Sequence, residues 1–475
     1  MSTFSIFSRQ KSRSRSCDTQ VLAGYLGRIF SEQYFLELCK ETGLLQRNRK
    51  CMPFTIFLLI LDMCASCTGN FSIKSLYLHY IKKSKLENRI NESSFFEQLQ
   101  KKAWKEIFFH YLNKLMFIQN KIPFSYGKPA TLHDYLFGYL GVSQIIAQDG
   151  TEIAVRPSCA KTMGASSKGR RNLDGTKARP SERMHLGNSS KGGISGAVLT
   201  PSAAKGAGER EHSLVHKNRR ILTISDRGYQ GSQYFSHASK NGNLFIIKGK
   251  GNSIARIISE NTDDLNTDIY RHYNKRLNEI IPGEGEVFDF IVKFSNNLAY
   301  RAIKTMINGS IIILYTNIFD KVIDANTILV FYRIRWALSE ISNKCLKSGN
   351  NLRAINSSKP EIVEMFFASS LCTYLLKNIL VSMSVKISGK NFSFSQIKIH
   401  LHSWTFLRPV FESLSKGTRK ILSQIKCFKE QYLDYFKRSK PSLRDVSLGK
   451  DIDILADTIV ANIQARSHCV GSYRA

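Results

Sequence analysis

The sequence has few acidic residues for its length. Its 475 residues include 69 Lys and Arg but only 37 Asp and Glu, which gives a formal net charge of +32. Hydrophobic residues make up 43% of the chain and charged residues 22%, an ordinary balance for a globular protein rather than a disordered one. Such an excess of positive charge indicates a negatively charged partner, most often the phosphate backbone of a nucleic acid, with a membrane surface as the alternative.

Several other features are missing. The ten cysteines are scattered without the dense spacing of a secreted disulfide framework, so we expect a reduced, cytoplasmic setting. The Cys64–Cys67 pair has no second ligand pair at zinc-binding spacing, and we expect core cysteines there. Residues 1–16 lack the apolar core of a secretory signal, and the apolar runs 53–61 and 365–383 suit core helices, not membrane spans. The chain also lacks a Gly-x4-Gly-Lys-Ser/Thr run, so NTP hydrolysis is not indicated.

The apolar pattern changes along the chain, and these changes predict its domains. Residues 1–18 are rich in Ser and Arg and are expected to be a disordered basic arm. Residues 19–130 have a helical pattern rich in Leu, Phe and Lys, typical of a compact helical domain with a basic surface. Residues 140–350 alternate short β-rich runs with helical patterns, which predicts an α/β domain. Residues 351–475 return to a helical pattern.

Within the α/β region, the strands are predicted by short β-rich runs that end at turn residues. Between them, the Gly-, Ser- and Lys-rich segment 160–183 has too few apolar residues to pack and is expected to be a flexible loop. The alternation in 286–294 predicts a β-rich insertion over 251–310. The other strand predictions are 142–150, 194–201, 219–231, 243–250 and 311–317.

Two aspartates follow such runs in a way that suggests chemistry. Asp149 and Asp226 each end an apolar β-run and are followed by an expected turn, in Asp-Gly and Asp-Arg-Gly. Ligands in open α/β sheets bind outside the carboxyl ends of strands, and two carboxylates there need a cation such as Mg²⁺. With Glu340 from a helical run, three acids could hold two metals about 3.5–4 Å apart for phosphoryl displacement. The alternative for either aspartate is simple turn chemistry.

The order of motifs over 140–350 resembles a known family. QDGTEIAV, LTPSAAKGAGEREH, ILTISDRGYQGSQYF, LYTN and FYRIRW occur in the order found in DDE transposases of bacterial insertion sequences. The subgroup is the one with a Tyr-Arg-Glu-Lys signature, founded on insertion sequence four. The likeness is looser in the N-terminal part, where KETGLLQRN (40–48) looks like the DNA-binding head of the family.

The resemblance implies a fold, a reaction and a set of site residues. The fold is an RNase H-like core with a β-rich insertion, flanked by an N-terminal helical DNA-binding domain and a helical C-terminal region. The reaction is metal-dependent nicking at the ends of the element, followed by strand transfer to target DNA. The cofactor is Mg²⁺, with Mn²⁺ also possible, bound by Asp149, Asp226 and Glu340. Phosphates of the element ends would be contacted by Tyr332, Arg335 and Lys347.

The resemblance also implies partners and a location. The partner is double-stranded DNA, both element ends and target, with a homodimer assembled on the DNA and no membrane. The location is cytoplasmic and nucleoid-associated, in a bacterium. Arg210 and Arg227 are further candidates for phosphate contacts, with solvated arginines as the alternative.

The chain departs from the family pattern at one point. The signature runs Tyr-x2-Arg-x3-Glu-x6-Lys, whereas four residues, 336–339, separate Arg335 from Glu340 here. One extra residue turns Glu340 by about 100° on a regular α-helix. We expect either a π-bulge that absorbs the extra residue or an impaired site, with Ser339 at the position of the acid.

Other assignments stay open on sequence alone. No Trp lies between 251 and 310, so a base-stacking aromatic would have to be Tyr270, Tyr273 or Phe290, each of which core packing explains as well. Lone His185 is expected to be structural. Two rival functions remain: a metal-dependent structure-specific nuclease on the same core, and a catalytically impaired, transposase-derived DNA-binding protein.

Overall fold

The structure is a computed structural model of the chain. The basic arm 1–18, the segment 159–180, Arg210, Tyr270 and residues 437–475 lie outside the described residues. The described residues are 19–45, 52–66, 72–119, 140–158, 181–189, 194–201, 220–261, 271–294, 297–350, 352, 354–355, 357–388 and 400–436.

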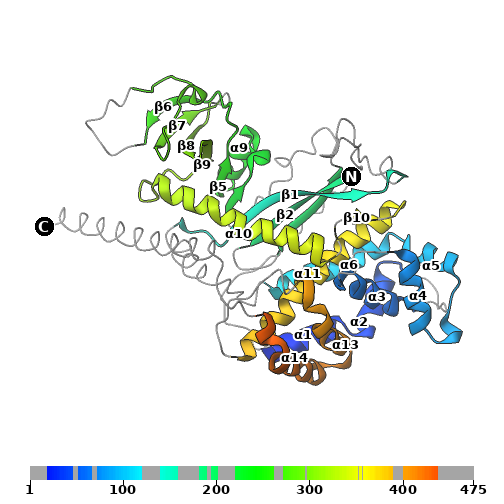
Figure 1. Cartoon of the computed structure of the whole chain (residues 1–475). Coiled ribbons are helices and arrows are strands. Elements are labelled where there is room, and N and C mark those ends of the chain that lie inside the picture. The colour runs from blue at the N-terminus through cyan, green and yellow to red at the C-terminus, as the bar shows by residue number, and fades with distance from the viewer. Residues whose placement is uncertain are drawn as a thin grey trace.

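A ten-stranded mixed sheet runs through the middle of the molecule (Figure 1). Its order is β3-β2-β1-β4-β5-β9-β8-β7-β6, and β10 pairs with β1. Strands β1, β4 and β5 are parallel to one another, β10 is parallel to β1, and the remaining pairs are antiparallel. The strands are β1 (Ile145–Val155), β2 (Ser181–Ser189), β3 (Ile194–Pro201), β4 (Leu222–Ser225), β5 (Leu244–Lys248), β6 (Arg256–Glu260), β7 (Val287–Lys293), β8 (Ala299–Ile307), β9 (Ser310–Thr316) and β10 (Ala354–Ile355).

The short apolar runs form the central strands because these strands are buried on both faces of the sheet. All of β4 and nearly all of β5 are buried, as expected for parallel strands covered on both faces. Every predicted run therefore contains a strand, and the prediction of an α/β region is confirmed. The expected insertion contains β6, β7 and β8. These strands extend the same sheet through β9, which pairs with both β5 and β8.

Helices cover both faces of this sheet. Helix α10 (Ala325–Gly349) begins at Asp324, whose Oδ1 accepts a hydrogen bond from the Thr327 backbone N at 2.7 Å. It packs across β1, β4 and β5 through an apolar cluster that includes Ile224, Ile246 and Phe331 (Figure 1). Helix α9 (Ser232–Lys240) packs on β5 and contributes to a second cluster, shared with strands β5 to β9.

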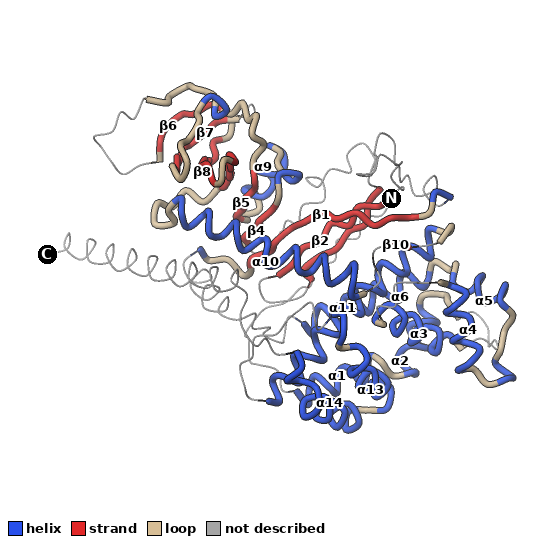
Figure 2. The backbone as a smooth tube through the Cα atoms, in the orientation of Figure 1, coloured by secondary structure: helices blue, strands red, loops and turns tan. Residues whose placement is uncertain are grey.

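The helices from both ends of the chain form one body below the sheet (Figure 2). A single apolar cluster joins them to one another and to the near face of β1, β2 and β3. The sequence predicted two separate helical regions, but α11 packs against α3, α6 and α14. The helices are α1 (Thr19–Ile29), α2 (Glu32–Glu41), α3 (Pro53–Ala65), α4 (Ile73–Lys83), α5 (Glu92–Leu99), α6 (Ala103–Gln119), α11 (Pro360–Ser388), α13 (Trp404–Ser413) and α14 (Thr418–Tyr432).

Helix α11 has the apolar composition of a core helix. By length and hydropathy alone it is a candidate membrane span over Pro360–Ser384, but the apolar window is entirely buried inside the structure. The prediction that 365–383 forms a core helix is thus confirmed. Cys64 is also a core residue, as predicted, and burial raises the pKa of its thiol to about 11.

Candidate active site

The register of two parallel strands brings the predicted aspartates together. Gln148 on β1 pairs with Ser225 on β4, and this is the last pair of their ladder. The Ser225 Oγ donates a hydrogen bond to the Gln148 Oε1 at 3.1 Å, and both side chains are buried. The next residue on each strand is an aspartate. Since neighbouring strands lie about 4.8 Å apart, Asp149 and Asp226 emerge side by side.

The surroundings of the two aspartates differ from each other. Asp226 ends β4 and precedes the short 3₁₀ helix η3 (Arg227–Tyr229), as the turn prediction required. Asp149 lies in the middle of β1, and Gly150 continues the strand opposite His185 of β2. The prediction of a turn at Asp149 is wrong, because β1 leaves β4 there but stays paired with β2 up to Ala154.

One face of α10 covers this pair of carboxylates. Tyr332, Arg335, Ser339 and Asn343 follow one another at helical spacing, and all four are buried. The Arg335 Nη1 lies 3.8 Å from the Asp149 Oδ1. The Arg335 guanidinium carbon lies 5.3 Å from the centre of the Tyr332 ring, within cation–π range.

Hydrogen bonds hold the Asp149 carboxylate in place. Its Oδ1 accepts from the Gly150 backbone N at 3.0 Å, and its Oδ2 accepts from the Asn343 Nδ2 at 2.9 Å. The Ser339 Oγ donates to the Arg335 carbonyl oxygen at 2.9 Å, one turn back along α10. Asp149 is therefore linked to α10 at two points, Arg335 and Asn343.

The pKa values of Asp149 and Tyr332 depend on the neighbouring charged groups of the site. Burial raises the pKa of Asp149; the Arg335 charge opposes this rise, and the Asp226 carboxylate adds to it. Burial also raises the pKa of Tyr332 to about 12, so its hydroxyl is protonated at neutral pH. Asp226 and Asp149 add to the shift of Tyr332, and Arg335 again opposes it.

The structure places the third predicted acid differently from the signature. Helix α10 is α-helical through 336–339, so the backbone contains no π-bulge there. Position 339 therefore lies over Asp149, and position 340 lies about 100° further round the helix axis. The side chain of Glu340 is outside the described part of the structure.

The remaining predicted site residues lie near the site or beyond the description. Arg227 is exposed and directly follows Asp226. Lys347 is partly buried near the end of α10, about 18 Å from Arg335 along the axis at 1.5 Å per residue. Of the three aromatic candidates in the insertion, Phe290 is a fully buried core residue, whereas Tyr273 is 55% exposed. His185 is buried, consistent with the structural role expected for it.

The residues present fit a divalent cation at the aspartate pair. Two neighbouring carboxylates repel each other when both are ionised, and a cation with oxygen ligands neutralises this repulsion. Within the described residues, however, no group of three or more His, Cys, Asp or Glu side chains gathers at one place. The other protein oxygens near the pair come from Ser339, which the sequence already places where the signature has its acid, and from Asn343, which was not predicted. Counting one more helical turn from Ser339 would have found Asn343.

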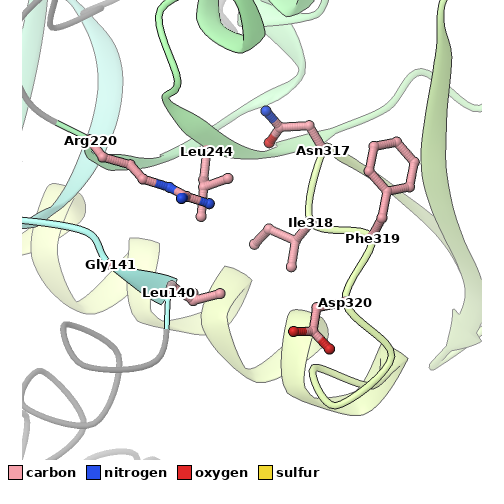
Figure 3. A pocket seen from close by; sticks show the side chains of 8 residues that line it. All are labelled: Leu140, Gly141, Arg220, Leu244, Asn317, Ile318, Phe319 and Asp320. Atoms are coloured by element: carbon pink, nitrogen blue, oxygen red, sulfur yellow. The ribbon is translucent and has the colours of Figure 1, made fainter.

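A pocket described in the structure belongs to the opposite end of the sheet (Figure 3). It opens beside the amino ends of β4 and β5, whereas Asp149 and Asp226 lie at the carboxyl end of the β1–β4 ladder. It is thus separate from the aspartate pair. Its lining residues are Leu140, Gly141, Arg220, Leu244, Asn317, Ile318, Phe319 and Asp320.

Comparison with known proteins links the middle of the chain to a family. A search of curated protein sequences finds nothing similar to the chain. Residues 141–376 match the family model described as Transposase DDE domain, and this segment contains the whole sheet, α10 and both aspartates. This segment is therefore similar to the DDE domain of transposases, and the match supports a function in DNA transposition.

Proposed function

We propose that this chain binds the ends of an insertion sequence and catalyses divalent-metal-dependent strand cleavage and strand transfer. The observation that carries the proposal is the adjacent pair Asp149 and Asp226, set by the register of β1 and β4 and covered by α10. Phosphoryl transfer of this kind needs metal-held carboxylates and cationic groups near the phosphate, and no protein nucleophile.

The sheet order supports the finer assignment. Three strands, β3-β2-β1, are antiparallel, and β4 and β5 then continue parallel to β1. This is the arrangement expected of the RNase H-like core that the resemblance implies. The insertion-sequence-four subgroup and its signature remain part of the proposal, with the extra residue before Glu340 as the departure.

The side chains around the pair have distinct parts in the proposed reaction. Asp149 and Asp226 would hold Mg²⁺ or Mn²⁺, which when bound polarises the phosphate and lowers the pKa of bound water. Arg335 is placed to share its charge between Asp149 and an incoming phosphate. Tyr332, protonated at neutral pH, can donate a hydrogen bond to a phosphate oxygen.

The roles of the remaining residues are inferred from the family signature and from the net charge of the chain. Glu340 is the third acid of the signature, and the cation affinity of the variant Glu340→Gln tests whether its carboxylate binds the metal. Lys347, Arg227 and Arg210 are proposed phosphate contacts. The net charge of +32 favours DNA as the partner, and pairing of two element ends would bring two copies together on the DNA.

The proposal is tested with a plasmid that carries the coding sequence together with its natural flanking DNA. With Mg²⁺ or Mn²⁺, we expect the parent protein to nick one strand at discrete positions in that flanking DNA. Asp149→Asn and Asp226→Asn are each expected to lower the nicking rate at least a hundredfold. The exposed acid Glu87 lies in the helical body, so Glu87→Gln is the matched control and should keep the parent rate.

Different outcomes separate the rivals. Nicks that follow DNA shape and ignore the flanking sequence would favour a structure-specific nuclease. Specific binding of the flanking DNA without any nicking, in the parent as in the aspartate variants, would favour an impaired DNA-binding protein. Strand-transfer products joined to a second plasmid would support the full reaction.

A further inference from the structure

The side-chain amide of Asn343 forms a hydrogen bond through its nitrogen but, among the described residues, not through its oxygen. Its Nδ2 donates a hydrogen bond to the Asp149 Oδ2 at 2.9 Å. Its Oδ1 is buried and accepts no hydrogen bond from any described residue. The whole side chain is only 9% exposed. A buried acceptor without a donor is unfavourable, so this oxygen is expected to meet a ligand in the working protein.

The surroundings of this amide favour a cation. Its nitrogen already contacts the Asp149 carboxylate, Asp226 adds a second carboxylate at the site, and Arg335 forms an ion pair with Asp149. Amide oxygens are good ligands for hard divalent cations, together with carboxylates. Rotation of the terminal amide exchanges its oxygen and nitrogen, so the same side chain can turn its oxygen toward Asp149 when a cation arrives.

Helix phase leaves Asn343 in the place of the third acid. Because α10 is regular, positions 332, 335, 339 and 343 share the face above the aspartates. Position 339 carries a serine whose hydroxyl donates to the Arg335 carbonyl oxygen. Asn343, one turn later, is the residue of this face that already touches Asp149 through its amide.

We propose that Asn343 supplies the third protein oxygen of the cation site formed by Asp149 and Asp226, in place of a third carboxylate. This inference rests on the proposed function, since it requires a cation at the aspartate pair. A site with two carboxylates and one amide carries less negative charge than one with three carboxylates. Its affinity for a divalent cation should therefore be correspondingly lower.

The test measures Mn²⁺ binding to the full chain by electron paramagnetic resonance, without DNA and without turnover. We expect Asn343→Leu, of similar size but with no ligand atom, to weaken binding about tenfold. We expect Asn343→Asp to tighten binding by a similar factor because it adds a charged ligand. Glu87→Gln, at an exposed acid of the helical body, is the matched control and should leave the affinity unchanged, and Glu340→Gln tests the acid of the signature as the competing ligand. Circular dichroism verifies that each variant is folded.

The outcomes separate this inference from the function on which it rests. Asp149→Asn with Asp226→Asn should abolish the bound Mn²⁺ signal; if the parent shows no binding that depends on these aspartates, the cation site itself is wrong. If the parent binds but Glu340→Gln weakens binding and Asn343→Leu does not, Glu340 is the ligand and the inference fails. Should Asn343→Leu not fold, Asn343→Asp alone decides, because an unchanged affinity contradicts a ligand at this position.

Discussion

At the scale of single residues, the chain contains two kinds of buried acid. Asp149 is buried next to Arg335 and two hydrogen-bond donors, and the Arg335 charge and the Gly150 hydrogen bond oppose the rise in pKa that burial causes. Glu182 on β2 is 2% exposed, and its Oε1 has no hydrogen-bond partner in the described structure. Burial, followed by the nearby Glu364, raises the pKa of Glu182 to about 8. The first acid fits a functional site, and the second is a cost to stability.

Glu182 gives a prediction about pH. Between the ordinary pKa of a glutamate and about 8, the folded state binds more protons than the unfolded state, so stability should fall as pH rises through this window. Glu182→Gln removes that titration. We expect its melting temperature to match the parent near pH 5 and to exceed it increasingly up to pH 8, by the equivalent of a few kcal/mol at most (about 1.4 kcal/mol per pKa unit).

Thermal unfolding of both proteins from pH 5 to pH 9 checks this. Glu87→Gln, at an exposed glutamate, should follow the parent at every pH. Curves for Glu182→Gln and the parent that run parallel across the range would contradict a raised pKa at this residue.

At the scale of elements, the sequence predicted what depends on local pattern. The runs that became β1, β4, β5 and β9 were found because buried strands need β-rich apolar segments. Asp149 and Asp226 were predicted because each follows an apolar β-rich run, and the structure places both directly after the last pair of the β1–β4 ladder. The contact of Asn343 with Asp149 was not predicted because it depends on helix phase over β1, and the strand that continues past Asp149 depends on its pairing with β2.

The end of α10 is fixed by a buried cation. The Lys377 Nζ donates to the carbonyl oxygens of Ala65 at 2.7 Å, Gly349 at 2.8 Å and His400 at 2.9 Å. Ala65 and Gly349 are the last residues of α3 and α10, where helix dipoles favour positive charge. A Cβ at Gly349 would lie 2.6 Å from the His400 Cβ, so this close approach requires glycine.

Lys377→Met is therefore expected to destabilise the fold by about 2–4 kcal/mol, because it removes three buried hydrogen bonds from a charged donor. Denaturant unfolding of the full chain measures the effect. Lys105, whose Nζ lies 2.9 Å from the Glu364 Oε1 in a partly exposed ion pair, is the control. Lys105→Met should cost no more than about 1 kcal/mol. Equal losses in the two variants would refute a special role for Lys377.

At the scale of the whole molecule, the charge predicts how DNA binding depends on salt. With a net charge of +32, neutralisation of phosphates should supply much of the binding free energy. If six or more phosphates are contacted, affinity for a DNA duplex should fall roughly a thousandfold or more between 50 and 200 mM salt. Fluorescence anisotropy with a labelled duplex measures the slope, and a flat response would count against DNA as the partner.

The two ends of the chain also meet across one interface. The Cys64 Sγ lies 3.2 Å from the Ser369 Oγ, and the Cys372 Sγ donates to the Phe108 carbonyl oxygen at 3.3 Å. Asp62 accepts from the Trp404 Nε1 at 2.9 Å and, with its other oxygen, from Arg408 at 2.7 Å. These contacts join α3 and α6 to α11 and α13 across some 300 residues of sequence. Segment 19–130 is thus one part of a larger helical body.

This arrangement predicts that the N-terminal segment does not fold alone. A fragment of residues 1–139 exposes the faces of α3 and α6 that α11 covers in the full chain, where Cys64 contacts Ser369 and the Phe108 carbonyl oxygen contacts Cys372. We expect it to retain helical far-ultraviolet circular dichroism but to unfold without a cooperative transition and to bind a hydrophobic dye. The full chain should unfold cooperatively in this region. A cooperative transition in the fragment would show instead an independent domain, as the sequence pattern alone suggested. In that case the apolar contacts among α1 to α6 would be enough to fold the segment. Helix α11 would then only pack against a domain that is already folded.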